Sequence, residues 1–136
     1  MTTDRLDALT AYARAWSLAD KDEIRADLER CWTDNSTYVN PFTDTVTGID
    51  GLTRLILDVP VMFPQATVRA TTTPDVHHDV ARCCWRLRSS APIRMLGHDY
   101  GRSVDGQDFV HFYRDGKIRQ VVAFFELPVE LPGPSV

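Results

Sequence analysis

Long apolar runs are missing from this sequence of 136 residues, since none approaches the roughly 18 residues that a membrane-spanning helix needs. The start, Met1 to Arg5, also lacks the apolar stretch of a signal peptide, so we expect a cytoplasmic protein with no membrane partner. Glycine and proline are scarce, at 7 and 8 residues, which excludes collagen-like, low-complexity and largely disordered chains. With 43% hydrophobic and 25% charged residues, the composition is that of a globular protein.

A basic tract is missing as well, because 15 Lys and Arg stand against 19 Asp and Glu, for a net charge of −4. Nucleic-acid binding through a positively charged stripe is therefore disfavoured, and small molecules or proteins are the expected partners. The length suits one domain, which can bury roughly 68% of the surface of its unfolded chain. Without an internal repeat or a linker, we predict a single domain over residues 1–136.

Cysteine is rare, and its placement argues against both disulfides and metal. The three residues Cys31, Cys83 and Cys84 form an odd set, and neighbours in one strand point to opposite faces. We therefore expect three reduced thiols. His77 and His78 lie near the pair, but no Cys-x-x-Cys or His-x-x-x-His spacing occurs, and we predict no metal site.

Apolar residues at helical spacing predict three helices in the first half of the chain. The first, over residues 4–18, should turn Tyr12 inward. The second begins after Asp20, because Asp20 and Glu23 have the spacing of a capping box. Pro60 kinks or ends the third. The apolar faces contain Leu6, Leu9, Ala13 and Trp16; Ile24, Leu28, Cys31 and Trp32; and Leu52, Leu55, Ile56 and Val59.

After residue 65 the apolar period shortens from 3.6 residues to 2, which is typical of strands. A short extended piece before Pro41 puts Asn40 at a strand end. The proline-rich tail, with Pro128, Pro132 and Pro134, should be irregular. The expected strands are 66–73, 80–88 and 93–104, followed by a hairpin of 108–113 and 118–127 around Asp115-Gly116.

Helices first and strands afterwards predict an α+β fold, in which three N-terminal helices pack on a curved, mainly antiparallel sheet. The curvature of such a sheet leaves a cone-shaped space between the sheet and the helices. A pocket between the sheet and the first helix is the natural place for a ligand.

Asp108 is the first candidate for chemistry, since it alternates with Val110 and Phe112 on one face of its strand. If this face looks into the cone, burial disfavours the charged form and raises the pKa, so that Asp108 can donate a proton near neutral pH. The alternative is an ion pair with an arginine of the sheet. Spacing alone slightly favours the pair, because structural ion pairs are commoner than buried acids. The arginines within reach are Arg82, Arg86 and Arg102.

Tyr12 also has two interpretations: core packing with the hydroxyl in solvent, or a hydroxyl that converges with Asp108 on one ligand oxygen.

Six other aromatic residues could line a ligand cavity or fill a core. His98-Asp99 is a weaker acid–base candidate, because the flanking glycines suggest a turn or bulge. We expect His77-His78-Asp79 at an exposed hairpin tip. The aromatic residues in question are Trp16, Trp32, Trp85, Phe63, Phe112 and Phe125.

The order helix, helix, Tyr-Val-Asn-Pro loop, helix, then a sheet closing on Gly-Lys-Ile and Phe-Phe-Glu resembles the nuclear transport factor 2-like (NTF2-like) superfamily. The resemblance covers residues 5–127 and points to the SnoaL-like polyketide cyclase and ketosteroid isomerase branches. It implies that Tyr12 donates to a substrate oxyanion and that Asp108 is the protonated partner donor. In the cyclases, Asp108 would be the acid or base of ring closure. The resemblance implies no cofactor.

Asn40 departs from the isomerase pattern, which has the proton-moving aspartate at this position. An amide can orient a carbonyl group or a water molecule but cannot abstract a proton. Tyr38 and Asn40 are also similar to the water-holding pair of limonene epoxide hydrolases. That activity is rejected, because residues 82–86 contain no aspartate and Ala123 stands where the last catalytic acid belongs.

The resemblance therefore implies a cofactor-free cyclase or isomerase that acts on a hydrophobic, polyketide- or steroid-like carbonyl compound. Asp108, Tyr12 and Asn40 would be catalytic. A non-catalytic ligand-binding or accessory protein is the alternative, since the basic aspartate is missing. A pure protein-interaction module would not require the pair of Tyr12 and Asp108. The expected substrate contacts are Trp16, Tyr38, Phe63, Trp85, Val110, Phe112, Val121, Ala123 and Phe125.

The opposite face of the predicted sheet is also apolar, with Phe109, His111, Tyr113 and Phe124. Such a face predicts a symmetric homodimer, unless the C-terminal tail covers it.

Overall fold

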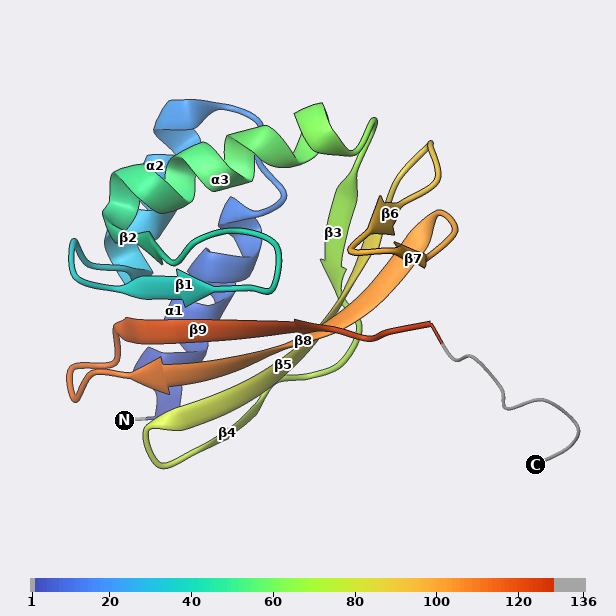
Figure 1. Cartoon of the computed structure of the whole chain (residues 1–136). Coiled ribbons are helices and arrows are strands. Elements are labelled where there is room, and N and C mark those ends of the chain that lie inside the picture. Colours follow the sequence, from blue (N-terminus) through green and yellow to red (C-terminus); the bar gives the residue numbers. More distant parts are fainter. Residues whose placement is uncertain (1, 129–136) are drawn as a thin grey trace, which may run out of the picture.

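The chain folds into a layer of helices and a curved sheet, as seen in a computed structural model that describes residues 2–128 (Figure 1). The helices are α1 (Thr2–Ala15), α2 (Lys21–Cys31) and α3 (Gly48–Met62). All three lie on one side of the sheet, which bends around them (Figure 1). Within residues 2–128, no helix is both long and apolar enough to cross a membrane.

The main sheet has the strand order β2-β1-β9-β8-β5-β3, with β4 also paired to β5. Strand β1 runs parallel to β9, and the other pairs are antiparallel. The predicted α+β fold with a mainly antiparallel sheet is thus confirmed. The strands are β1 (Thr37–Val39), β2 (Val46–Thr47), β3 (Thr67–Ala70), β4 (Asp75–His77), β5 (Val80–Arg88), β8 (Ser103–Phe112) and β9 (Ile118–Phe125).

Helix α2 begins where the capping-box spacing predicted. The Asp20 side chain accepts a hydrogen bond from the backbone N–H of Glu23 at 3.0 Å, which satisfies one of the free donors at a helix start. The helix ends at Trp32, whose backbone N–H donates to the Leu28 carbonyl at 2.7 Å. This end places the Trp32 indole under α1, where it becomes part of the core.

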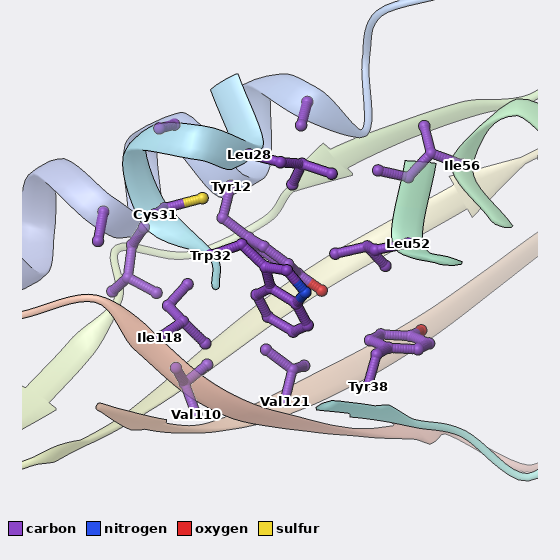
Figure 2. Close-up of a cluster of buried hydrophobic side chains, with 14 of the residues drawn as sticks. Tyr12, Leu28, Cys31, Trp32, Tyr38, Leu52, Ile56, Val110, Ile118 and Val121 are labelled. Carbon is purple, nitrogen blue, oxygen red and sulfur yellow. The ribbon is translucent and has the colours of Figure 1, made fainter. Parts of the chain in front are cut away.

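The core fills the closed end of the cone with aromatic and aliphatic side chains (Figure 2). Tyr12 of α1 stacks on Trp32, with ring centroids 5.7 Å apart. The Trp32 indole N–H donates to the Gly48 carbonyl at 3.2 Å, so the buried ring has a polar partner as well as packing. Figure 2 shows the Tyr12 hydroxyl directed toward the side of the cluster where Tyr38 and Leu52 lie. The core therefore fixes the tyrosine that was predicted to face inward.

The predicted strand over residues 93–104 is wrong. Two short strands, β6 (Arg94–Met95) and β7 (His98–Asp99), form a separate ladder. Leu96 and Gly97 connect them with φ angles of 49° and 79°, which an extended strand cannot contain. Strand β8 then starts at Ser103, earlier than predicted, because Gly106 lies within the ladder rather than in a turn.

The ends of the other predicted elements need smaller corrections. Helix α1 ends at Ala15, because the N–H groups of Ser17 and Leu18 turn back to the carbonyls of Arg14 and Ala15. Strand β4 was not predicted; it makes residues 75–88 a hairpin. Gly116, with φ of 94°, turns the chain between β8 and β9 as expected. Of the proline-rich tail, Pro128 has no regular structure, and Pro132 and Pro134 lie outside the described residues.

Candidate functional site

A cavity of about 230 Å³ lies between the concave face of the sheet and helices α1 and α3. Its lining includes six of the nine residues predicted to contact substrate: Trp16, Tyr38, Phe63, Trp85, Val110 and Phe125. The other three, Phe112, Val121 and Ala123, were placed in the cavity wall incorrectly. Like Trp32, they are buried in the core at the closed end of the cone, which side chains of α1 and α2 fill.

Asp108 of β8 reaches this cavity and is only 8% exposed. Its carboxyl oxygen Oδ1 accepts a hydrogen bond from the Trp85 indole N–H at 2.9 Å. Burial raises the pKa of Asp108 to about 7, while the Trp85 hydrogen bond acts in the opposite direction. At neutral pH a large fraction of the group is therefore a carboxylic acid that can donate a proton.

The ion-pair interpretation of Asp108 is wrong, because the nearby arginines point away from the cavity. Arg86 binds Asp105 on the outer face, with Nε to Oδ1 at 2.6 Å. Arg82 lies 3.6 Å from Asp75, also outside. Arg102 is exposed in the turn that precedes β8. Alternation along the strand separates these cations from the acid, which explains why its pKa is not lowered by them.

Gly106 allows the Trp85 indole to lie flat on the sheet and reach Asp108. It is in register with Trp85 on one side and with Phe125 on the other. A Cβ at Gly106 would come closer than 3.0 Å to three atoms of the Trp85 ring. Phe125 holds the indole from the far side, with ring centroids 5.0 Å apart and nearly perpendicular. This role of Trp85 was not predicted; the signal that the sequence offers is Gly106 inside a strand pattern.

Tyr12 is 5% exposed, and its hydroxyl oxygen has no hydrogen-bond partner among the described residues. Of the two interpretations of Tyr12, the one with the hydroxyl in solvent is therefore wrong. Burial raises the pKa of Tyr12 well above its usual value, and the charge of Asp108 raises it further. The group stays a neutral O–H at physiological pH. A buried, unpaired donor beside a cavity is costly unless a ligand accepts its hydrogen bond.

Besides Asp108 and Tyr12, the polar residues Asn40 and Tyr38 line the cavity. The Asn40 side-chain oxygen accepts from the backbone N–H groups of Phe42 and Thr43 at 2.8 and 2.9 Å and from the Thr43 hydroxyl at 3.2 Å. These three donors occupy the oxygen, so the amide N–H₂ is the part left to donate, and its nearness to Tyr38 acts to lower the pKa of that hydroxyl. Burial raises the pKa of Tyr38, so its hydroxyl is also a neutral donor.

Comparison with known proteins relies on structure, because no family model and no curated protein matches the sequence. A SnoaL-like family protein from Agrobacterium tumefaciens str. C58 is 29% identical, with a TM-score of 0.73 over 91% of this chain and 98% of that one. The chain has the NTF2-like fold, and this neighbour supports the SnoaL-like branch of that superfamily. A SnoaL-like protein from Jannaschia sp. CCS1 has the same fold at 16% identity, with a TM-score of 0.65 over 88% of this chain and 85% of that one.

TerC, crystallised with polyporic acid, also shares the NTF2-like fold. It is 15% identical, with a TM-score of 0.69 over 90% of this chain and 92% of that one. At this identity the likeness establishes the fold alone. The residues of the cavity in the present chain must therefore be interpreted from their own geometry.

The other candidate residues lie outside the cavity of this NTF2-like cone. His98 and Asp99 are on the separate β6–β7 ladder, where Asp99 lies 3.6 Å from Arg94. His77 and His78 are exposed at the β4–β5 turn, as expected. Residues 2–128 contain no group of three His, Cys, Asp or Glu side chains placed to hold a metal ion.

The three cysteines are free, and Cys31 is buried. Cys83 lies in the cavity wall, but burial raises the pKa of its thiol to about 12. Burial has the same effect on Cys31 in the core. A thiol that stays protonated is a weak nucleophile, so Asp108 remains the titratable group of interest in the cavity.

Replacing Trp85 by Phe should raise the pKa of Asp108 further. Phe keeps an aromatic ring against Phe125 but removes the N–H that stabilises the carboxylate, and we expect the titration midpoint to move up by about 1 pH unit. The measurement is ¹³C NMR of the Asp108 carboxyl carbon from pH 4 to 10. Trp16→Phe is the matched control, since Trp16 lines the cavity without a bond to Asp108. Equal midpoints for Trp85→Phe and the parent would refute the role given to this hydrogen bond.

Proposed function

We propose that the cavity binds a hydrophobic carbonyl compound and that Asp108 acts as the general acid of a cofactor-free isomerisation or cyclisation. The observation that supports this most strongly is the carboxyl group of Asp108, buried among apolar walls with a pKa near neutrality. A catalytic acid is most effective when its pKa is close to the working pH. The Tyr12 hydroxyl is the second donor to the same carbonyl oxygen.

The proposed reaction is an enolisation that Asp108 carries out alone, because the described cavity wall holds no other carboxylate and no histidine. The neutral acid gives its proton to the carbonyl oxygen while Tyr12 donates a hydrogen bond to that oxygen. The carboxylate that results removes a proton from the adjacent carbon, and the C–H electron pair forms the C=C bond of the enol. Asp108 is thereby returned to its acid form. Asn40 and Tyr38 orient the substrate.

A second candidate function is ligand binding without turnover. Asn40 favours ligand binding without turnover, because its amide is not a base and its side-chain oxygen already accepts three hydrogen bonds. TerC, a structural relative, was crystallised with polyporic acid, which supports the use of such a cone as a binding site. Binding alone would need the same cavity and the same donors.

Exchange of the ligand's own protons for deuterium distinguishes the enzyme from the non-catalytic binder. A thermal-shift screen with steroids, bicyclic ketones and polycyclic phenols first identifies ligands, whose stabilisation should follow mass action. Exchange of the protons next to the carbonyl group is then followed by ¹H NMR in D₂O. Protein-dependent exchange supports the enzyme. Tight binding without exchange for any ketone would leave the binding function and rule out the proposed acid chemistry.

We further propose a symmetric homodimer through the outer face of the sheet. Phe109 and Phe124 are 40% and 57% exposed there, and their rings pack together with centroids 5.6 Å apart. Large exposed apolar patches are typical of interfaces, and this aromatic pair would be the centre of such a patch. Light scattering should give twice the chain mass for the parent and the single mass for Phe124→Lys. Leu96→Lys, at an exposed apolar residue elsewhere, should stay dimeric. A monomeric parent would refute the dimer.

A further inference from the structure

The volume of the cavity limits the size of the ligand. A buried cavity of about 150 Å³ is enough for benzene, and sites for drug-sized ligands measure about 300–1,000 Å³. The present cavity, at about 230 Å³, falls between these sizes. A single ring would leave empty space against the walls, whereas two fused rings would fill it. Four fused rings would extend beyond the enclosed part.

The walls of the cavity are mostly apolar and include seven aromatic side chains, which favour a flat, uncharged molecule. Phe42 and Phe125 meet edge to face with centroids 4.5 Å apart, and Trp16 lies 5.5 Å from Tyr38. Arg69 also lines the cavity, but the strand register directs its charge to the outer face. It is in register with Arg86, whose guanidinium is on the outer face, and strand alternation directs Arg69 to that face as well.

The side-chain polar groups of the cavity offer hydrogen-bond donors and no free strong acceptor. The Tyr12 hydroxyl is buried and unpaired among the described residues, and Asp108 in its acid form carries a proton to donate. The side-chain oxygen of Asn40, which could have accepted, is used by Phe42 and Thr43. A ligand hydroxyl or N–H placed here could donate only to the weakly accepting oxygens of a phenol and a neutral acid, whereas a carbonyl oxygen would gain two donors.

We propose that the site selects a flat, uncharged molecule of two fused rings that directs a carbonyl oxygen, and no hydrogen-bond donor, toward Tyr12 and Asp108. This inference rests on the proposed function, because it assigns the substrate class of the same cavity. It narrows that class from steroid-sized compounds to bicyclic aryl ketones. Such a ketone, with a CH₂ group next to the carbonyl carbon, is also a substrate for the proposed enolisation.

Three probes of nearly equal shape test the chemistry of the carbonyl group. We expect 1-tetralone to bind about tenfold more tightly than the hydrocarbon tetralin and than the alcohol 1-tetralol, as measured by calorimetry at pH 6. In Tyr12→Phe, this preference for the ketone should fall several-fold, while the affinity for tetralin stays the same. Tyr113→Phe, outside the cavity lining, is the control and should bind all three probes like the parent. Equal affinities of the parent for the three probes would overturn the proposal.

A series of ring sizes tests the volume. Among acetophenone, 1-tetralone and androst-4-ene-3,17-dione, the bicyclic ketone should bind most tightly, and the four-ring steroid at least tenfold more weakly. Tighter binding of the steroid would overturn the size limit, and the proposed acid chemistry would stand if the protein still exchanged the steroid's protons. Preferred binding of 1-tetralone without any proton exchange would confirm the ligand class and leave the protein a binder. Failure of the size limit and failure of the proposed acid chemistry therefore give different results.

Discussion

Asp108→Asn is expected to lower protein-dependent proton exchange of a ketone by at least about 100-fold and, at the same time, to stabilise the folded protein at pH 8. Asn has nearly the shape of the carboxyl group, and its oxygen can accept the same hydrogen bond from Trp85. It has no proton to transfer at neutral pH. The variant therefore keeps the cavity and loses the acid.

The gain in stability follows from the direction of the pKa shift of Asp108. Its pKa is about 7 in the folded chain and 3.8 in the reference state. The folded form therefore binds the proton more tightly, so the contribution of this group to stability is fully present below about pH 4. It is lost as the pH rises through 7, by about 4 kcal/mol in total. Asn at this position cannot ionise, so the variant escapes that loss.

Urea denaturation at pH 5 and pH 8 tests this prediction. The parent should lose stability between the two values, and Asp108→Asn should lose much less. Asp105→Asn on the same strand is the control: its ion pair with Arg86 lowers the pKa of Asp105, so its removal should cost a little stability at neutral pH. An Asp108→Asn variant that is less stable than the parent at pH 8 would contradict the account.

Gly106→Ala should destabilise the fold and disturb Asp108 without touching either partner of the Trp85–Asp108 hydrogen bond. The added methyl group would overlap the Trp85 ring, and Phe125 blocks retreat on one side. Overpacking of this kind costs about 1–3 kcal/mol, which lowers the melting temperature by several degrees for a chain of this length. The displaced indole should release Asp108, and the titration midpoint of Asp108 should rise.

A double-mutant cycle separates this mechanism from a general loss of stability. In a Trp85→Phe background, the hydrogen bond is already absent, so adding Gly106→Ala should leave the titration of Asp108 unchanged. The smaller ring should also reduce the cost in melting temperature. An additive shift of the Asp108 midpoint in the double variant would show that Gly106 acts by another route.

The inward direction of Tyr12, and the strand face that Asp108 shares with Val110 and Phe112, could be predicted from periodicity alone. Helical spacing places Tyr12 next to the apolar stripe of α1, and alternation with Val110 and Phe112 fixes the face of Asp108. Both predictions depend only on neighbours along the chain. The fold class followed for the same reason, because the change of period near residue 66 separates helices from strands.

The surroundings of these residues could not be predicted, because they depend on how strands pair. Trp85 and Asp108 are 23 positions apart, and only the register that sets Trp85 opposite Gly106 brings the indole to the carboxyl group. For the same reason, Arg86 was a plausible partner of Asp108 until its position on the outer face was seen. The three donors that occupy the Asn40 oxygen come from a loop whose path has no periodic pattern.

The most direct test of the account is the ¹³C NMR titration of the Asp108 carboxyl carbon in the folded parent protein, assigned with Asp108→Asn. We expect a midpoint near pH 7, well above the ordinary aspartate value of 3.8. We also expect 1-tetralone to raise this midpoint, since the ketone oxygen accepts a hydrogen bond from the acid form alone. A midpoint near 4, unchanged by the ketone, would mean that a carboxylate occupies the cavity at neutral pH, and the proposed acid would be lost.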